Sequence, residues 1–302
     1  MVPFRIGAKL PSSGAQPAEH GIPAMARRLE VAGFDSAWVS DHVLMTEDTS
    51  RSYYPFGDDG SPGWDVEMPW YDALIVLAQA AAVTETIELG TAVLVLPQRH
   101  PIVLAKQVAS LDALAGGRVA LGVGAGWFRE EFEALGVDFD ARGKRFSEWL
   151  ELLRRCWQGR PEAFDGVHYQ LPAGVIHEPT PARHVPLLIG GVSGIALRRA
   201  ATQGDGWLGL QRADRLDPDE VAGAVARMRA EATAAGRDPA ELRVVLRIIL
   251  SAGRTDLVAA TVPALRAAGV DEIVVDTDWE ADLDEQRVLD RLRDAASQGA
   301  AR

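Results

Sequence analysis

A single histidine directly follows both a strand-like segment and a carboxylate. His42 comes after Asp41 at the end of "SAWVSD", residues 36–41. Because imidazole titrates near neutral pH, it can exchange a proton with a substrate, and this makes His42 the candidate catalytic residue. The alternative is a loop histidine that hydrogen-bonds only to the backbone, and the residue types alone leave both interpretations open.

The stretch "LGVGAGW", residues 121–127, is rich in glycine and also ends a strand-like segment. Gly122, Gly124 and Gly126 are spaced as G-x-G-x-G. The Rossmann dinucleotide fingerprint needs G-x-G-x-x-G, so this stretch is not a Rossmann loop. Glycines here could simply let a strand turn tightly into a loop.

A second glycine-rich stretch, "GGVSG" at residues 190–194, opens a helix-like segment. Ser193 is placed to cap that helix, and free amides at a helix start can bind an anion such as phosphate. A plain helix cap explains Ser193 equally well. Gly190 and Gly191 favour close approach of a ligand to the backbone.

Other kinds of chemistry find no support in the residue pattern. The sequence has no H-E-x-x-H or similar metal-ligand spacing, and Cys156 is its one cysteine, so neither a metal site nor an intramolecular disulfide is expected. There is no G-x-S-x-G motif, and no pair of carboxylates stands out. Glycine-lined backbone, aromatic side chains and one or two titratable groups suit a bound redox cofactor, which the protein positions.

Composition limits the partners. The 302 residues are 47% hydrophobic and 25% charged, with a net charge of −12, which disfavours a nucleic-acid partner. No run approaches the 18 apolar residues of a membrane span, and "MVPFRIGAKL" lacks signal-peptide architecture. The sequence predicts a cytoplasmic protein that binds a small molecule and no membrane.

Strand-like and helix-like segments alternate along the whole chain. Alternation of this kind predicts parallel strands joined by helical crossovers. The expected strands are 4–10, 36–41, 87–95, 118–126, 186–191, 206–210, 243–250 and 272–277, and the expected helices are 22–32, 70–84, 101–115, 146–157, 194–203, 217–235, 256–268 and 284–298.

Eight such repeats predict a (β/α)8 TIM barrel, with a doubly wound open sheet as the alternative. We expect one domain over 1–302, with its catalytic face at the carboxyl ends of the strands. Two stretches are insertions at that face. Residues 43–69 are polar, with glycine, proline and aromatics, and are predicted to be a mobile lid; residues 160–185 contain a small hairpin.

Three long stretches of the chain resemble the bacterial-luciferase-like family, and within it the F420-dependent oxidoreductases. They are "GFDSAWVSDH" (33–42), the segment 89–153 that begins "LGTAVLVLPQRHPIVLAKQ", and "PLLIGGVSGIALRRAATQGDGWL" (186–208). The resemblance implies a (β/α)8 barrel, in agreement with the count of strands.

The resemblance also implies a role for each matching residue. A bulge at the end of the third strand, often with a non-proline cis peptide, would back the flavin ring. The residue pair at the end of the second strand would lie near the reactive face of that ring. The fourth strand would line the pocket, and the turn after the fifth strand would contact the phosphate. The implied cofactor-binding residues are Thr91, Ala92 and Val93, Asp41 and His42, Gly124, Gly126 and Trp127, and Gly190, Gly191, Val192 and Ser193.

Two departures from the family pattern bear on the cofactor and the substrate. Some F420-dependent sugar-phosphate dehydrogenases carry a glutamate where Trp127 stands, which puts their particular substrate in doubt. The luciferases proper carry a phosphate-gripping arginine where Ala125 stands, so coenzyme F420 is favoured over FMN.

The leading hypothesis is therefore an F420-dependent oxidoreductase acting on an unidentified small organic substrate, with His42 handling the proton. The alternatives are an FMN-dependent two-component monooxygenase that uses reduced flavin and O2, and a flavin-binding protein without catalysis. The resemblance further implies a homodimer and a flavin or F420 reductase that supplies reduced cofactor.

Overall fold

Eight parallel strands close into a barrel in this computed structural model, which describes residues 3–279 and 285–298. Around the barrel the strands follow the order β1-β10-β9-β8-β7-β4-β3-β2, and every pair is parallel. The (β/α)8 prediction is confirmed, and the open-sheet alternative is wrong. The strands are β1 Arg5–Lys9, β2 Ser36–Val39, β3 Glu88–Val95, β4 Val119–Gly124, β7 Leu187–Gly190, β8 Gly206–Arg212, β9 Arg243–Ile249 and β10 Glu272–Val275.

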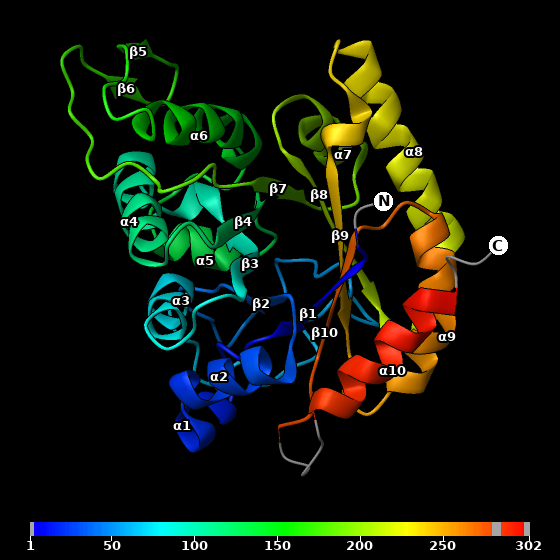
Figure 1. Ribbon diagram of the computed structural model, residues 1–302. Helices are drawn as coiled ribbons and strands as arrows, with labels where there is room; N and C mark the ends of the chain where they lie inside the picture. Colours follow the sequence, from blue (N-terminus) through cyan, green and yellow to red (C-terminus); the bar gives the residue numbers. More distant parts are fainter. Residues whose placement is uncertain (1–2, 280–284, 299–302) are drawn as a thin grey trace.

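Helices surround the strands on the outside, and α9 and α10 lie side by side along one flank (Figure 1). They form because one stripe of each is apolar: α2, for example, buries Met25, Ala26 and Leu29 and ends at Gly33 with φ 93°. The expected helices are present as α2 Ile22–Ala32, α3 Ala73–Ala81, α4 Pro101–Leu114, α6 Arg142–Cys156, α7 Gly194–Thr202, α8 Pro218–Ala234, α9 Thr255–Ala267 and α10 Glu285–Gln298.

Local structure departs from the sequence expectation in a few places. Helix α3 starts at Ala73 rather than at residue 70, because the Asp72 side chain accepts hydrogen bonds from the amides of Leu74 and Ile75 and so caps the helix there. Two short helices, α1 Gln16–His20 and α5 Arg129–Ala134, were not predicted, since neither is long enough to show an apolar period. The predicted hairpin is confirmed as the antiparallel pair β5 Phe164–Asp165 and β6 Gln170–Leu171.

The inside of the barrel is layered because side chains alternate along each strand. On β1, Arg5, Gly7 and Lys9 share the inner face. The middle layer is apolar and fills the barrel interior. Its buried residues are Trp38, Ala120, Leu188, Leu208, Val245 and Val274.

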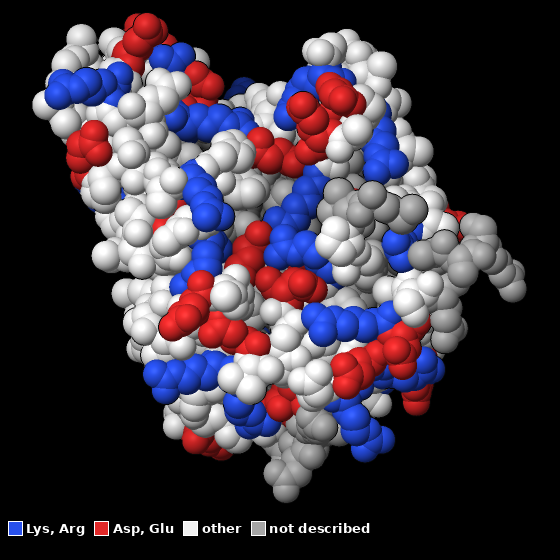
Figure 2. Space-filling model, viewed as in Figure 1, with Lys and Arg blue, Asp and Glu red and all other residues white. Residues whose placement is uncertain are grey.

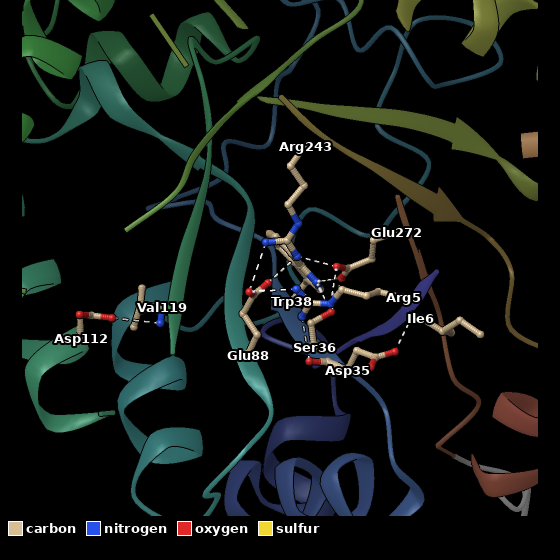
Figure 3. A network of polar contacts seen from close by, with 10 residues as sticks. All are labelled: Arg5, Ile6, Asp35, Ser36, Trp38, Glu88, Asp112, Val119, Arg243 and Glu272. Atoms are coloured by element: carbon tan, nitrogen blue, oxygen red, sulfur yellow. Dashed lines mark hydrogen bonds and ion pairs between the residues drawn. The ribbon is translucent and has the colours of Figure 1, made fainter. Parts of the chain in front are cut away.

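Below the apolar layer, at the amino ends of the strands, lies a network of four charged residues. Arg243 contacts Glu88 at 2.6 Å and Glu272 at 2.5 Å, and Arg5 contacts the same two carboxylates at 3.2 and 3.3 Å. Figure 3 shows the four side chains converging, with Trp38 beside Glu272. Two guanidinium and two carboxylate groups balance one another, so this end of the barrel is closed without net charge.

Charges of both signs are spread over the outer surface. On the face seen in Figure 2, basic and acidic side chains are interspersed among the described residues rather than gathered into one basic area. None of the described helices is both long and apolar enough to cross a membrane.

The fit of Trp38 inside the barrel yields a stability prediction. A Cβ added at Gly90 would lie 2.4 Å from Trp38 Cε3. We expect Gly90→Ala to lower the free energy of unfolding by about 1–3 kcal/mol, because the buried indole cannot move away. Urea denaturation measures the change. Gly223→Ala on α8 is the control: no atom lies within 4 Å of its added Cβ, so stability should hold or rise, and equal effects of the two substitutions would contradict the prediction.

Candidate functional site

A cavity of about 740 Å³ opens at the carboxyl ends of the barrel strands. This is the face where a (β/α)8 barrel gathers the loops that follow its strands. Most of the predicted site residues line the cavity, although they come from four different strands and the segments that follow them. These are Asp41, His42, Ala92, Val93, Gly124, Gly126, Trp127, Gly190, Gly191 and Ser193.

Two of the predicted residues do not line this cavity. The hydroxyl of Thr91 is buried and donates to the carbonyl of Gly122 at 2.8 Å, so it ties β3 to β4. Val192 is 51% exposed and borders a smaller hollow between α7 and α8. Thr91 and Val192 therefore stand outside the cavity lining, although their neighbours in sequence are part of it.

His42 lies in the cavity wall against a buried carboxylate. Its Nδ1 is 3.2 Å from Oε2 of Glu131, and both residues are buried. The Trp70 and His42 rings pack in a T-shaped arrangement at a centroid distance of 4.7 Å, and Trp127 packs on His42 in the same way at 5.8 Å. With Nδ1 engaged by Glu131, Nε2 is the ring nitrogen left to meet a ligand.

The Glu131 carboxylate is saturated with hydrogen bonds. It accepts from the amides of Val43 at 2.6 Å and Leu44 at 3.3 Å, and from the side-chain amide of Gln98 at 2.5 Å. Burial alone would raise the pKa of the Glu131 carboxyl, but the hydrogen bonds from His42, Gln98 and Val43 outweigh it and hold the pKa below the ordinary value.

Sequence reasoning missed Glu131. The stretch "REEFEA" of α5 is acidic and typical of a solvated helix, and only Phe132 beside Glu131 hinted that this turn is buried. Asp41, the other member of the predicted strand-2 pair, lines the cavity, and its carboxylate is engaged within the protein. Its carboxylate accepts two hydrogen bonds from Arg99, at 2.6 and 2.7 Å, and one from the amide of Val95 at 3.0 Å.

The predicted bulge is present at the end of β3. The pairing with β4 shifts register between Thr91 and Leu94, and the peptide bond between Ala92 and Val93 is cis. The Val93 side chain then enters the space where Gly124 and Gly190 lack side chains, since a Cβ at either glycine would come within 2.7 Å of it. These two glycines therefore make room for the bulge, and Ala92 and Val93 both line the cavity.

The turn after β7 carries exposed polar groups at the cavity rim. Ser193 caps α7 by accepting a hydrogen bond from the amide of Ala196 at 3.2 Å, and Gly191 adopts φ 113°, which favours glycine. A basic residue that the sequence analysis did not single out, Arg199, lines the same part of the cavity; its guanidinium donates to the carbonyl of Gly143 and lies over the Phe146 ring.

Aromatic residues of the segment 43–69 cover His42. Tyr54 packs at 5.0 Å from both Trp64 and Trp127, and Trp64 lies 6.2 Å from the His42 ring. Burial raises the pKa of the Tyr54 phenol to about 12, so this hydroxyl stays protonated at neutral pH. The expectation that 43–69 covers the barrel mouth fits this packing, while its mobility stays a prediction.

Comparison with known proteins identifies the family. The family model described as luciferase-like monooxygenase matches residues 1–302. The chain belongs to this family. Its similar proteins include an uncharacterized protein of Mycobacterium bovis, 36% identical over 73% of this chain and 75% of its own length.

Two further similar proteins carry a named activity. An F420-dependent glucose-6-phosphate dehydrogenase of Beutenbergia cavernae is 36% identical over 68% of this chain, and the match spans 56% of the dehydrogenase. A solved F420-dependent secondary alcohol dehydrogenase, in complex with an F420-acetone adduct, has a TM-score of 0.78 and 18% identity over 96% of this chain and 99% of that one. The second likeness establishes the shared fold.

The lowered pKa of Glu131 generates a prediction about acid stability. In the folded protein this pKa lies below its ordinary value of 4.5, so the ionised carboxylate stabilises the fold above that pH and the contribution is lost as the pH falls through the folded-state pKa. We expect the stability advantage of the wild type over Glu131→Gln to hold from neutral pH down to about pH 4.5 and to shrink as the pH falls further.

Urea denaturation at a series of pH values measures this advantage. Glu47→Gln, which removes an exposed carboxylate of the 43–69 segment, is the matched control for the loss of one negative charge. A difference between wild type and Glu131→Gln that does not shrink below pH 4.5, or that is already lost above it, would contradict the assignment.

Proposed function

We propose that this protein is an F420-dependent oxidoreductase that moves a hydride between coenzyme F420 and a small organic substrate. One observation carries the proposal: a buried His42–Glu131 pair faces a large aromatic cavity whose back wall is the β3 bulge. Membership of the luciferase-like family, and a relative named as an F420-dependent dehydrogenase, support the choice of cofactor.

The cavity fits a flat tricyclic ring with a polar tail. Its volume lies in the range of cofactor sites, and its walls are largely aromatic and aliphatic. The indole nitrogens of Trp64 and Trp70 are buried without a hydrogen-bond partner among the described residues, so both remain as donors for a bound molecule. When bound, F420 supplies hydride chemistry without activating oxygen.

The turn after β7 would hold the phosphate of the cofactor. The first amides of α7 are free of helical partners, and a helix start favours negative charge. Arg199 adds a positive side chain on the same wall of the cavity. This chain has Ala125 at the position where the luciferases proper carry an arginine that holds phosphate. Because Ser193 and Gly191 are exposed at the rim, the charged tail would reach toward solvent.

His42 would hold or move the proton that accompanies the hydride. Glu131 fixes the orientation of the ring through Nδ1, so Nε2 can donate to or accept from a substrate atom. The surrounding indoles exclude water from this proton transfer.

Retention of the cofactor tests the proposal first. We expect the protein to retain F420 and not FMN when each is added separately and unbound cofactor is removed by gel filtration. Ser193→Asp should weaken F420 binding roughly tenfold, because aspartate still caps the helix but places a like charge at the anion site. Ser297→Asp, exposed on α10, is the control and should bind as the wild type does.

Retention of FMN in place of F420 would contradict the proposal and favour a two-component monooxygenase. Unchanged F420 affinity in Ser193→Asp would contradict the assignment of the turn after β7 to the cofactor phosphate, but not the assignment of F420 as the cofactor.

The second test concerns His42, once a substrate is found. His42→Ala should slow turnover by roughly 100- to 10,000-fold, the usual effect of losing general acid–base catalysis. Affinity for F420 should fall much less, because the phosphate and ring-backing contacts come from other strands.

Titration of F420 against His42→Ala at fixed substrate decides between two roles. If His42 only holds the ring by a hydrogen bond, saturating cofactor would largely restore the rate. Rescue of this kind would reject proton transfer, and F420 binding without turnover on any substrate tested would favour a carrier.

A further inference from the structure

One lysine lies on the inside of the barrel, at the floor of the cavity. The sequence has only three lysines, and Lys9 is the last residue of β1. It shares the inner face of that strand with Arg5 and Gly7, so it stands above the apolar layer and lines the cavity. A charged side chain buried in the barrel is costly unless an opposite charge or hydrogen bonds compensate it.

The nearest charged groups are already paired with each other. The Arg247 guanidinium donates to the carbonyls of Ile248 at 2.7 Å and Val274 at 3.2 Å, and it forms an ion pair with Asp276. Asp276 also accepts from the amide of Ser251 at 3.2 Å. The charges of Arg247 and Asp276 therefore compensate each other within the protein.

Lys9 has no such partner. Its ammonium makes neither a hydrogen bond nor an ion pair with any residue that the structure describes. Burial, and then the charge of Arg247, lower the pKa of Lys9, as expected for a cation without enough compensation. Since Arg247 and Asp276 cancel, the floor of the cavity carries one uncompensated positive charge whenever Lys9 is protonated.

A second unpartnered group lies on the neighbouring strand end. Thr277, just beyond β10, is 8% exposed and lines the cavity, and its hydroxyl is buried without a hydrogen-bond partner among the described residues. β1 and β10 pair directly, so Lys9 and Thr277 border the same part of the wall. A buried hydroxyl without a hydrogen-bond partner destabilises the protein, and a ligand oxygen that accepted its hydrogen bond would remove this cost.

We propose that Lys9 and Thr277 form an anion-binding subsite for the substrate, which is therefore a small organic molecule bearing a carboxylate or phosphate. The proposal rests on the oxidoreductase function above in taking the ligand to be the substrate. β1 and β7 stand four places apart in the eight-stranded barrel, so this subsite lies across the mouth from the Ser193 turn. Cofactor phosphate and substrate anion would then occupy opposite walls.

Benzoate and benzamide test the subsite, because they match in size and differ in charge. Their binding is followed by tryptophan fluorescence, since Trp64, Trp70, Trp127 and Trp279 line the cavity. We expect the F420-loaded protein to bind benzoate at least about tenfold more tightly than benzamide. Lys9→Met should abolish this preference, Lys9→Arg should keep most of it, and Thr277→Val should reduce it.

Lys144→Met is the matched control, because Lys144 is exposed on α6. Equal binding of benzoate and benzamide by the wild type, or a benzoate preference that survives in Lys9→Met, would overturn the proposal. Circular dichroism verifies that each variant is folded, and the comparison of the two probes on the wild type stands even if Lys9→Met does not fold.

The same titration on protein without cofactor separates the two proposals. If F420 does not bind but benzoate is still preferred through Lys9, the oxidoreductase assignment fails and the anion subsite stands. If F420 binds and Lys9→Met leaves the preference unchanged, the subsite fails and the oxidoreductase assignment stands.

Discussion

The whole structure depends on one constraint, the alternation of side chains along strands that close on themselves. Every second residue of each strand must point into a space that only its counterparts on the other strands can fill. At the amino ends the counterparts are charged, and Arg5, Arg243, Glu88 and Glu272 neutralise one another. In the middle they are apolar, and Trp38 takes the room that Gly90 leaves. With the middle filled, the side chains nearest the carboxyl ends have no counterpart above them, and a cavity remains there.

The same constraint decides which groups can face that cavity and in what state. Polar side chains on the inner positions near the strand ends are either paired with one another or left without a partner until a ligand binds. Arg247 and Asp276 are paired, whereas Lys9 is not paired with any described residue. Opposite them, β4 and β7 present glycines, because the bulged Val93 uses the space a side chain would need. The wall formed by β4 and β7 is therefore shaped mainly by backbone, with Arg199 beside it, whereas the wall formed by β1, β9 and β10 carries Lys9, Arg247 and Asp276. This division is consistent with the proposed cofactor against the first wall and the proposed substrate against the second.

The fold could be predicted because periodicity and turn residues are local properties. Eight strands, eight helices and the hairpin near residues 164–171 all follow from patterns a few residues long, as do the placement of His42 and the Ser193 cap. The site was predicted less completely, because its decisive contacts join distant residues. Glu131 meets His42 across 89 positions of sequence, and nothing in "REEFEA" marks one acidic residue as buried. Thr91 and Val192 fell on the right segments but face away from the cavity, since a resemblance between segments fixes the backbone position and not the direction of every side chain.

Helix α5 links the cover of the cavity to the group that would do the chemistry. Glu131 holds the His42 ring and, through the amides of Val43 and Leu44, the first residues of the 43–69 segment. Glu130 and Glu133, on the same short helix, bind Ser52 and Arg51 farther along that segment. Any displacement of 43–69 therefore acts on α5, and a shift of α5 moves the carboxylate on which the imidazole depends. The same six-residue helix therefore positions both the imidazole and the segment whose aromatic residues pack over it.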